Sequence, residues 1–216
     1  MALWGRSKPV FRPPPGPLRL HVGCGRARLE GWVNIDQQDL PGVDVIADVT
    51  RGLGFSGAET IFAEHFLEHL RVDAAVDFLL EARSALIPGG RLRLSTPNLD
   101  WVMLHAYRPE APAERKPHEA LVINRGFHGW GHQFLWNREI LAQALHACGF
   151  TEIEWCRWGE SSRPELRGIE RHFTDLDSAE LPHVLIAEAL RGEPRPQALA
   201  DFRALVEREF LSQLQG

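Results

Sequence analysis

The stretch LRLHVGCG, residues 18–25, is a short and mainly apolar run that ends on two glycines separated by a single cysteine. A short apolar run that is stopped by glycine predicts a buried β-strand. Glycine has no side chain, so the backbone after such a strand can approach a ligand closely, and its amides can hydrogen-bond that ligand. A Gly-x-Gly turn alone is common, and its meaning depends on the residues that come after it in the chain.

Acidic residues follow at the ends of the next two predicted strands. GWVNID (31–36) ends at Asp36, and VDVIADV (43–49) carries Asp48 near its end. A carboxylate after the second strand can accept hydrogen bonds from both hydroxyls of a ribose, and one after the third can accept from an adenine amino group. Open α/β sheets bind ligands at the carboxyl ends of their strands, so these features predict a nucleotide-like ligand there.

The rest of the chain continues the alternation of strands and helices. Helical spacing of apolar residues from Val72 predicts a helix over 72–87, and Asn137 is a good N-cap for a second helix that closes at Gly149. Further strands are expected at residues 60–65, 91–97, 151–158 and 183–190. This order predicts an α/β fold with helices on both faces of a mainly parallel sheet of seven strands.

The predicted domain has three flanking or inserted segments. Residues 1–17 are rich in proline and predict a flexible leader before the domain at 18–190. Residues 99–136 show no clean period and follow a strand, which predicts a lid or insertion over the ligand edge. Residues 191–216 predict an amphipathic helix, which either packs on its own domain or contacts a second copy in a homodimer.

Composition argues against several classes of protein. The net charge of -5 and the pI of about 6.1 do not provide the extended basic stripe of a nucleic-acid-binding protein. No apolar run reaches the ~20 residues that span a bilayer, and the N-terminal residues lack a secretory signal. Three cysteines at unrelated spacings suit free thiols, so we expect a cytoplasmic protein with a small-molecule partner.

A longer series of motifs resembles a known family. LHVGCG, WVNID, VIADVT, FAEHFLEHL, LIPGGRLRLSTPN and ALHACGF are similar to the class I S-adenosylmethionine-dependent methyltransferases, and especially to a small bacterial, methyltransferase type 11-like group. The resemblance covers residues 18–190. It implies a Rossmann-like three-layer sandwich with the last strand antiparallel, S-adenosyl-L-methionine as cofactor, and methyl transfer to a sugar, a glycan precursor or another small metabolite.

Nine residues are candidates for cofactor binding, and the resemblance implies seven of them: Gly23, Gly25, Asp36, Asp48, Val49, Glu64 and His65, to which His21 and Cys24 of the same stretch are added. The glycines would form the cofactor loop, and Asp36 would hold the ribose. Asp48 and the residue after it would flank adenine, whereas Glu64 and His65 would lie beside the methionine part. His21 stands where many members carry an acid, two residues before the first glycine.

Three histidines are candidates for the catalytic base, because imidazole titrates near neutral pH: His65, His69 and His132. A base is needed only for an acceptor that must lose a proton, such as a hydroxyl or an amine. For His132 two interpretations stay open. Its ring either hydrogen-bonds the backbone of its loop or faces the acceptor.

Rival interpretations come from the same motifs. HFLEH (65–69) spells the H-x-x-E-H signature of a zinc-peptidase group, but that signature needs a long helix, and here it starts at a predicted strand end. His128 and His132 are separated by glycines that argue against a helix, so we predict no metal site. An NAD-dependent oxidoreductase would need glycine at Arg28 and a later acid. A methyltransferase-like binding protein without turnover stays open, because of His21.

Overall fold

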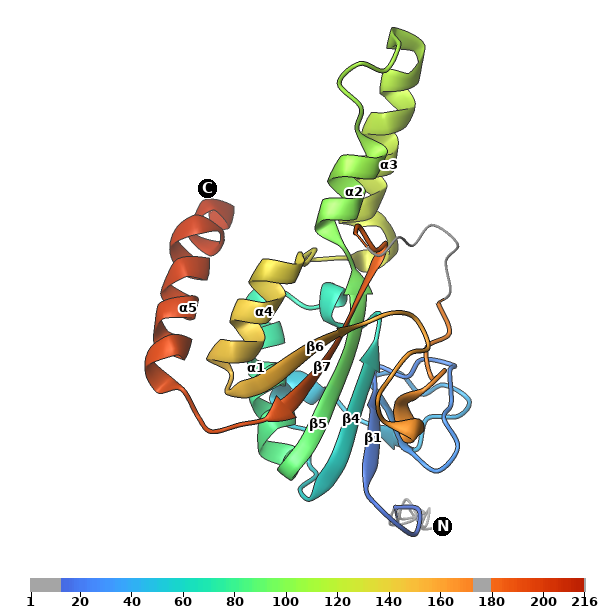
Figure 1. The fold of residues 1–216 in the computed structure, drawn as a ribbon, viewed down its shortest axis with the longest axis vertical. Helices are drawn as coiled ribbons and strands as arrows, with labels where there is room; N and C mark the ends of the chain where they lie inside the picture. Colours follow the sequence, from blue (N-terminus) through green and yellow to red (C-terminus); the bar gives the residue numbers. More distant parts are fainter. Residues whose placement is uncertain (1–12, 173–179, 216) are drawn as a thin grey trace, which may run out of the picture.

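The computed structural model describes residues 13–172 and 180–215, so most of the predicted leader lies outside the described residues. Seven strands form one sheet in the order β3-β2-β1-β4-β5-β7-β6 (Figure 1). Only β7 runs antiparallel, against both β5 and β6. The predicted sheet is therefore confirmed. The strands are β1 (Arg19–Val22), β2 (Val33–Asp36), β3 (Val45–Ile46), β4 (Ala58–Glu64), β5 (Leu86–Pro97), β6 (Phe150–Cys156) and β7 (Val184–Arg191).

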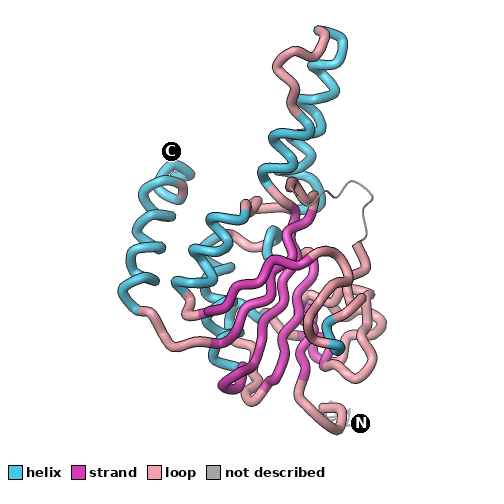
Figure 2. The backbone as a smooth tube through the Cα atoms, in the orientation of Figure 1, coloured by secondary structure: helices cyan, strands magenta, loops and turns pink. Residues whose placement is uncertain are grey.

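The two faces of the sheet are covered differently (Figure 2). Helices α1 (Val72–Ala85), α4 (Arg138–Ala147) and α5 (Pro196–Glu209) cover one face and bury the main apolar core. Loops cover the other face, where Trp32 and Leu166 pack on Phe62 of β4. Helices were expected on both faces, but this face is covered by the loops after β1 and after β6, which carry Trp32 and Leu166.

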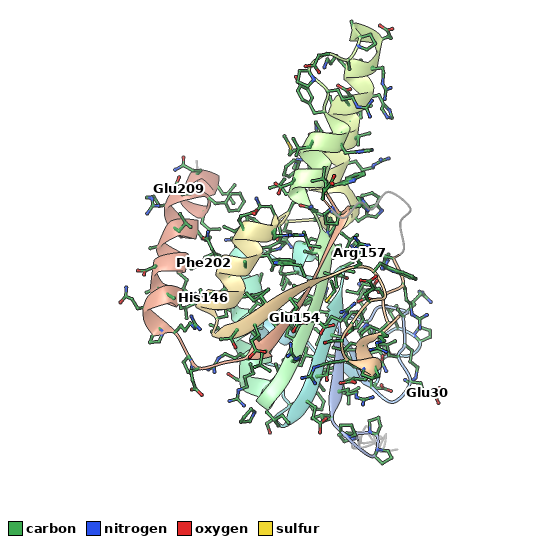
Figure 3. All side chains as sticks on the ribbon, in the orientation of Figure 1. Glu30, His146, Glu154, Arg157, Phe202 and Glu209 are labelled. Atoms are coloured by element: carbon green, nitrogen blue, oxygen red, sulfur yellow. The ribbon has the colours of Figure 1, made fainter. Side chains whose placement is uncertain are left out.

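The C-terminal segment packs on its own domain, as one of the two predicted alternatives requires. Phe202 and Val206 of α5 are buried, and Arg203 forms an ion pair with Asp77 of α1. Figure 3 shows Phe202 and His146 in the region where α5 faces α4. No helix among the described residues is long and apolar enough to cross a bilayer.

Two predicted element boundaries are wrong. The strand expected over 43–49 contains only Val45–Ile46, because Asp48 instead caps a 3-10 turn by accepting hydrogen bonds from the amide and hydroxyl of Thr50. The fifth strand begins at Leu86, directly after α1, rather than at Arg91. A register shift between β4 and β5 accommodates the residues between Leu86 and Arg91, which include Pro88, Gly89 and Gly90.

The segment 99–136 is not an irregular loop. It contains two helices, α2 (Leu99–Ala106) and α3 (Lys116–His128), which form a hairpin that projects beyond the carboxyl edge of the sheet (Figure 1). Val102 is the buried residue of α2 and Glu119 that of α3. Since neither helix buries an apolar stripe against the body, the sequence shows no helical period there.

Candidate active site

Two cavities lie side by side at the carboxyl edge of the sheet. The smaller, about 500 Å³, lies beside the ends of β2 and β3. The larger, about 850 Å³, lies between the ends of β1 and β4 and the α2–α3 hairpin. Four residues line both cavities: Gly23, His65, His69 and Trp130. A single ligand can therefore extend from one cavity into the other.

The glycine turn after β1 has the backbone that its sequence predicts. Gly23 and Gly25 have φ of 64° and 52°, in the left-handed region that side chains disfavour. A Cβ at Gly23 would lie 2.4 Å from the ring of Phe66. The amide of Gly25 donates to Asp36 Oδ2 at 2.8 Å, so the end of β2 fixes the turn. Cys24 is buried there, and burial raises the pKa of its thiol to about 11, which suits a small residue that fills the turn.

The predicted ribose and adenine residues line the smaller cavity together. Asp36, Asp48 and Val49 all contribute to its wall. Asp36 also accepts a hydrogen bond from the amide of Gln38, which fixes the orientation of its carboxylate. The structure thus brings together three residues that come from the ends of two different strands.

His21 lines the larger cavity as a neutral imidazole. Its Nδ1 lies 3.1 Å from Asn34 Oδ1. The Asn34 amide donates to the carbonyls of Leu29 and Trp32, so its oxygen is the acceptor and His21 donates. Burial lowers the pKa of His21 to about 4. Nε2 is therefore an acceptor at neutral pH.

Glu64 at the end of β4 and His65 directly after it each form hydrogen bonds beside the larger cavity. Glu64 accepts hydrogen bonds from the amides of Arg171 and His172, at 2.7 and 3.0 Å, and so holds this segment beside the larger cavity. His65 has a φ of 47°, and its Nδ1 donates to Glu68 Oε1 at 2.9 Å. Its Nε2 is buried and has no hydrogen-bond partner in the part of the chain that the structure describes.

The other two candidate bases lie together. The rings of His69 and His132 are 5.2 Å apart, although the two residues are distant in the chain, because Gln133 bonds the backbone of the 67–69 turn. His132 Nδ1 donates to the carbonyl of Gly126 at 2.8 Å, which leaves Nε2 as an acceptor. The ring thus bonds the loop backbone, as one of the two interpretations requires, and it also lines the larger cavity.

Comparisons with known proteins address the fold. No family model and no curated protein matches the sequence. Among solved structures, a SAM-dependent methyltransferase from Archaeoglobus fulgidus superposes with a TM-score of 0.52 at 16% identity, over 81% of this chain and 86% of that one. An S-adenosylmethionine-dependent methyltransferase from Mesorhizobium loti gives 0.51 at 17% identity, over 81% and 90%. The chain has the class I methyltransferase fold.

A third similar structure belongs to a larger protein. It is described as a possible exported protein from Bordetella parapertussis, with a TM-score of 0.50 and 15% identity. The match covers 85% of this chain but only 64% of that one, so this chain spans less than two thirds of its length. At these identities the comparison establishes the methyltransferase fold and no more.

Within the methyltransferase fold, sequence reasoning missed much of the wall of the larger cavity. Arg125 and Trp101 come from the hairpin, and Arg171 and His172 come from the loop after β6. The aromatic content of 99–136 was a usable signal for the hairpin, but nothing in the sequence marks 171–172. Glu68 was also missed as a site residue. The H-x-x-E-H run containing it forms a bend and one 3-10 turn, not the long helix of the peptidase signature.

Proposed function

We propose that this protein is an S-adenosylmethionine-dependent methyltransferase that acts on a small molecule. The observation that carries the proposal is the junction of the two cavities at Gly23, His65 and His69. The smaller cavity has the carboxylates that suit an adenosine, whereas the larger has the volume of a small-molecule pocket. A cofactor whose adenosine fills the first would bring its sulfonium to the junction and its methyl group toward the second.

The residues around the junction can hold each part of the cofactor. Asp36 would accept the ribose hydroxyls, and Asp48 would accept from the adenine amino group. The methionine part would enter the larger cavity beside the glycine turn. There the neutral His21 offers Nε2 as an acceptor for the cofactor's ammonium group. This would replace the acid that the family resemblance leads one to expect at this position.

The chemistry of the transfer is supplied mainly by the cofactor, because a sulfonium activates its own methyl group. The acceptor atom forms a bond to the methyl carbon while the carbon–sulfur bond breaks, and the electron pair stays on sulfur. The protein has to align the two reactants and, for a hydroxyl or amine, remove a proton. His132 would take part on the acceptor side, because its Nδ1 is bonded to the Gly126 carbonyl and its Nε2 is left as an acceptor in a residue that lines the larger cavity.

Calorimetry with S-adenosylhomocysteine tests the cofactor assignment. Asp36→Ala should weaken binding by about 1.5–3 kcal/mol, or roughly 10- to 150-fold, since a charged hydrogen-bond partner of the ribose is lost. Asp39→Ala is the matched control, because Asp39 is exposed and lines neither cavity. Equal affinity of the Asp36 variant and the wild type would refute the assignment. Binding of NADH in place of S-adenosylhomocysteine would favour an oxidoreductase, and binding without methyl transfer a non-catalytic protein.

A further inference from the structure

A carboxylate and two imidazoles converge on one point of the larger cavity. Glu68 and His69 belong to the 3-10 turn after β4, and His132 follows α3. One potential ligand atom of each lies within 4.8 Å of those of the other two. All three residues line the larger cavity. This trio is not the H-x-x-E-H set, because its second histidine comes from the hairpin segment.

Contacts behind the trio fix two of its members in the way that metal ligands are commonly fixed. His132 donates from Nδ1 to the Gly126 carbonyl, so the atom left for coordination is Nε2. The carboxylate of Glu68 is fully buried, and it accepts from His65 at one oxygen and from the hydroxyl of Thr96 at the other. Such outer contacts set the tautomer of a ligating imidazole and the orientation of a ligating carboxylate.

We propose that Glu68, His69 and His132 bind one divalent transition-metal ion. Two imidazoles and one carboxylate suit Zn²⁺ or Fe²⁺. Three protein ligands leave further coordination positions, which is the arrangement of catalytic metal sites rather than structural ones. Because the trio lines the larger cavity, the open positions would face the acceptor.

The role of the ion rests on the proposed function. Bound to an oxygen of the acceptor, the ion would lower the pKa of a hydroxyl group there. The hydroxyl proton would pass to solvent, the oxygen would bond to the methyl carbon, and the electron pair of the broken carbon–sulfur bond would stay on sulfur. The imidazoles of His69 and His132 would then serve as ligands, and neither would be the base.

Metal titration of the untagged, chelator-treated full chain tests the site without any cofactor. Co²⁺ is the probe, because its visible absorption reports nitrogen and oxygen ligation, and Zn²⁺ competition then gives the relative affinity. We expect one saturable ion per chain. His69→Ala and His132→Ala should each weaken binding by more than about 100-fold, since each removes a ligand. His128→Ala is the matched control, because it lies four residues from His132 and outside the trio.

Two results would overturn the proposal. One is the lack of saturable Co²⁺ binding by a wild type whose circular dichroism shows it to be folded. The other is equal weakening by His128→Ala and His132→Ala. A thermal melt of each variant shows whether weaker Co²⁺ binding comes from unfolding of the protein or from removal of a coordinating side chain. If the wild type binds Co²⁺ but not S-adenosylhomocysteine, the proposed function is refuted and the metal site stands. If it binds S-adenosylhomocysteine but not Co²⁺, the metal site is refuted and the proposed function stands.

Discussion

His21 lies in β1, with its ring stacked on Phe62 of the neighbouring strand at a centroid distance of 5.2 Å. Its side chain is buried, and its hydrogen bond to Asn34 is too weak a compensation to keep the ring charged at neutral pH. Desolvation is the main cause of the lowered pKa, because burial penalises the charged form of an imidazole. The ring is therefore a polar but uncharged part of the cavity wall.

This lowered pKa predicts a stability loss in mild acid. The ordinary pKa of a histidine is 6.5, and the pKa of His21 in the folded chain is about 4. Between these two pH values the unfolded chain binds a proton at His21 that the folded chain does not. The free energy of unfolding should thus fall as the pH falls through this window, by about 3 kcal/mol in all. His21→Gln removes the titration. Urea unfolding at pH 7, 6 and 5 should show the wild type losing more stability than the variant, and parallel profiles would contradict the prediction.

At the scale of elements, a buried ion-pair network joins β5, β7 and the loop before residue 171. Arg93 of β5 pairs with Glu188, its cross-strand neighbour in β7, and with Glu170 of the loop. All three side chains are buried, and Arg93 also donates to the carbonyl of Glu160. The network holds on the sheet the loop whose next residue, Arg171, lines the larger cavity.

Replacement of Arg93, the cation at the centre of this network, should therefore destabilise the folded protein. Arg93→Met leaves two buried carboxylates without their partner, so it should lower the free energy of unfolding by about 3–5 kcal/mol. Arg203→Met is the matched control. It breaks the exposed pair with Asp77, so its expected cost is below about 1 kcal/mol. Chemical denaturation measures both, and similar losses for the two variants would show that burial of the pair is unimportant.

The elements differ in how far the sequence could predict them. The sheet and α1 were predictable because their apolar residues face a common core, which leaves a period in the sequence. Asp36 was predictable because a strand end places it. The helices of the hairpin, the loop at 171–172 and the meeting of Glu68 with His132 were not, since they depend on contacts between distant segments that have no local pattern.

At the scale of the whole molecule, the α2–α3 hairpin stands over the edge where both cavities open (Figure 1). It joins the body at the end of β5 and again at the turn that carries His132. Trp130, in the same turn, is 72% exposed and lines both cavities. We expect the hairpin to act as a lid that closes over the acceptor, a common use of segments at the rim of an active site.

The lid hypothesis predicts how His132→Ala divides its effect between binding and turnover. The variant should lower turnover and leave affinity for S-adenosylhomocysteine nearly unchanged, because both the acceptor and the proposed metal ion lie on the side of the site away from the adenosine. Steady-state kinetics and calorimetry on the same preparation measure the two effects. A parallel loss of both would instead assign His132 to the cofactor pocket or to the core of the turn.

The position of β7 between β5 and β6 has a consequence for synthesis on the ribosome. β7 is the last strand to be translated, yet it supplies the hydrogen-bonding partner of β5 on one side and of β6 on the other. The nascent chain thus carries an open edge on β5 while the hairpin, α4 and β6 are being made, and unpaired edges are sites where chains aggregate. Among the seven strands, only Val184–Arg191 closes that edge, so the sheet cannot be completed before this strand has been translated.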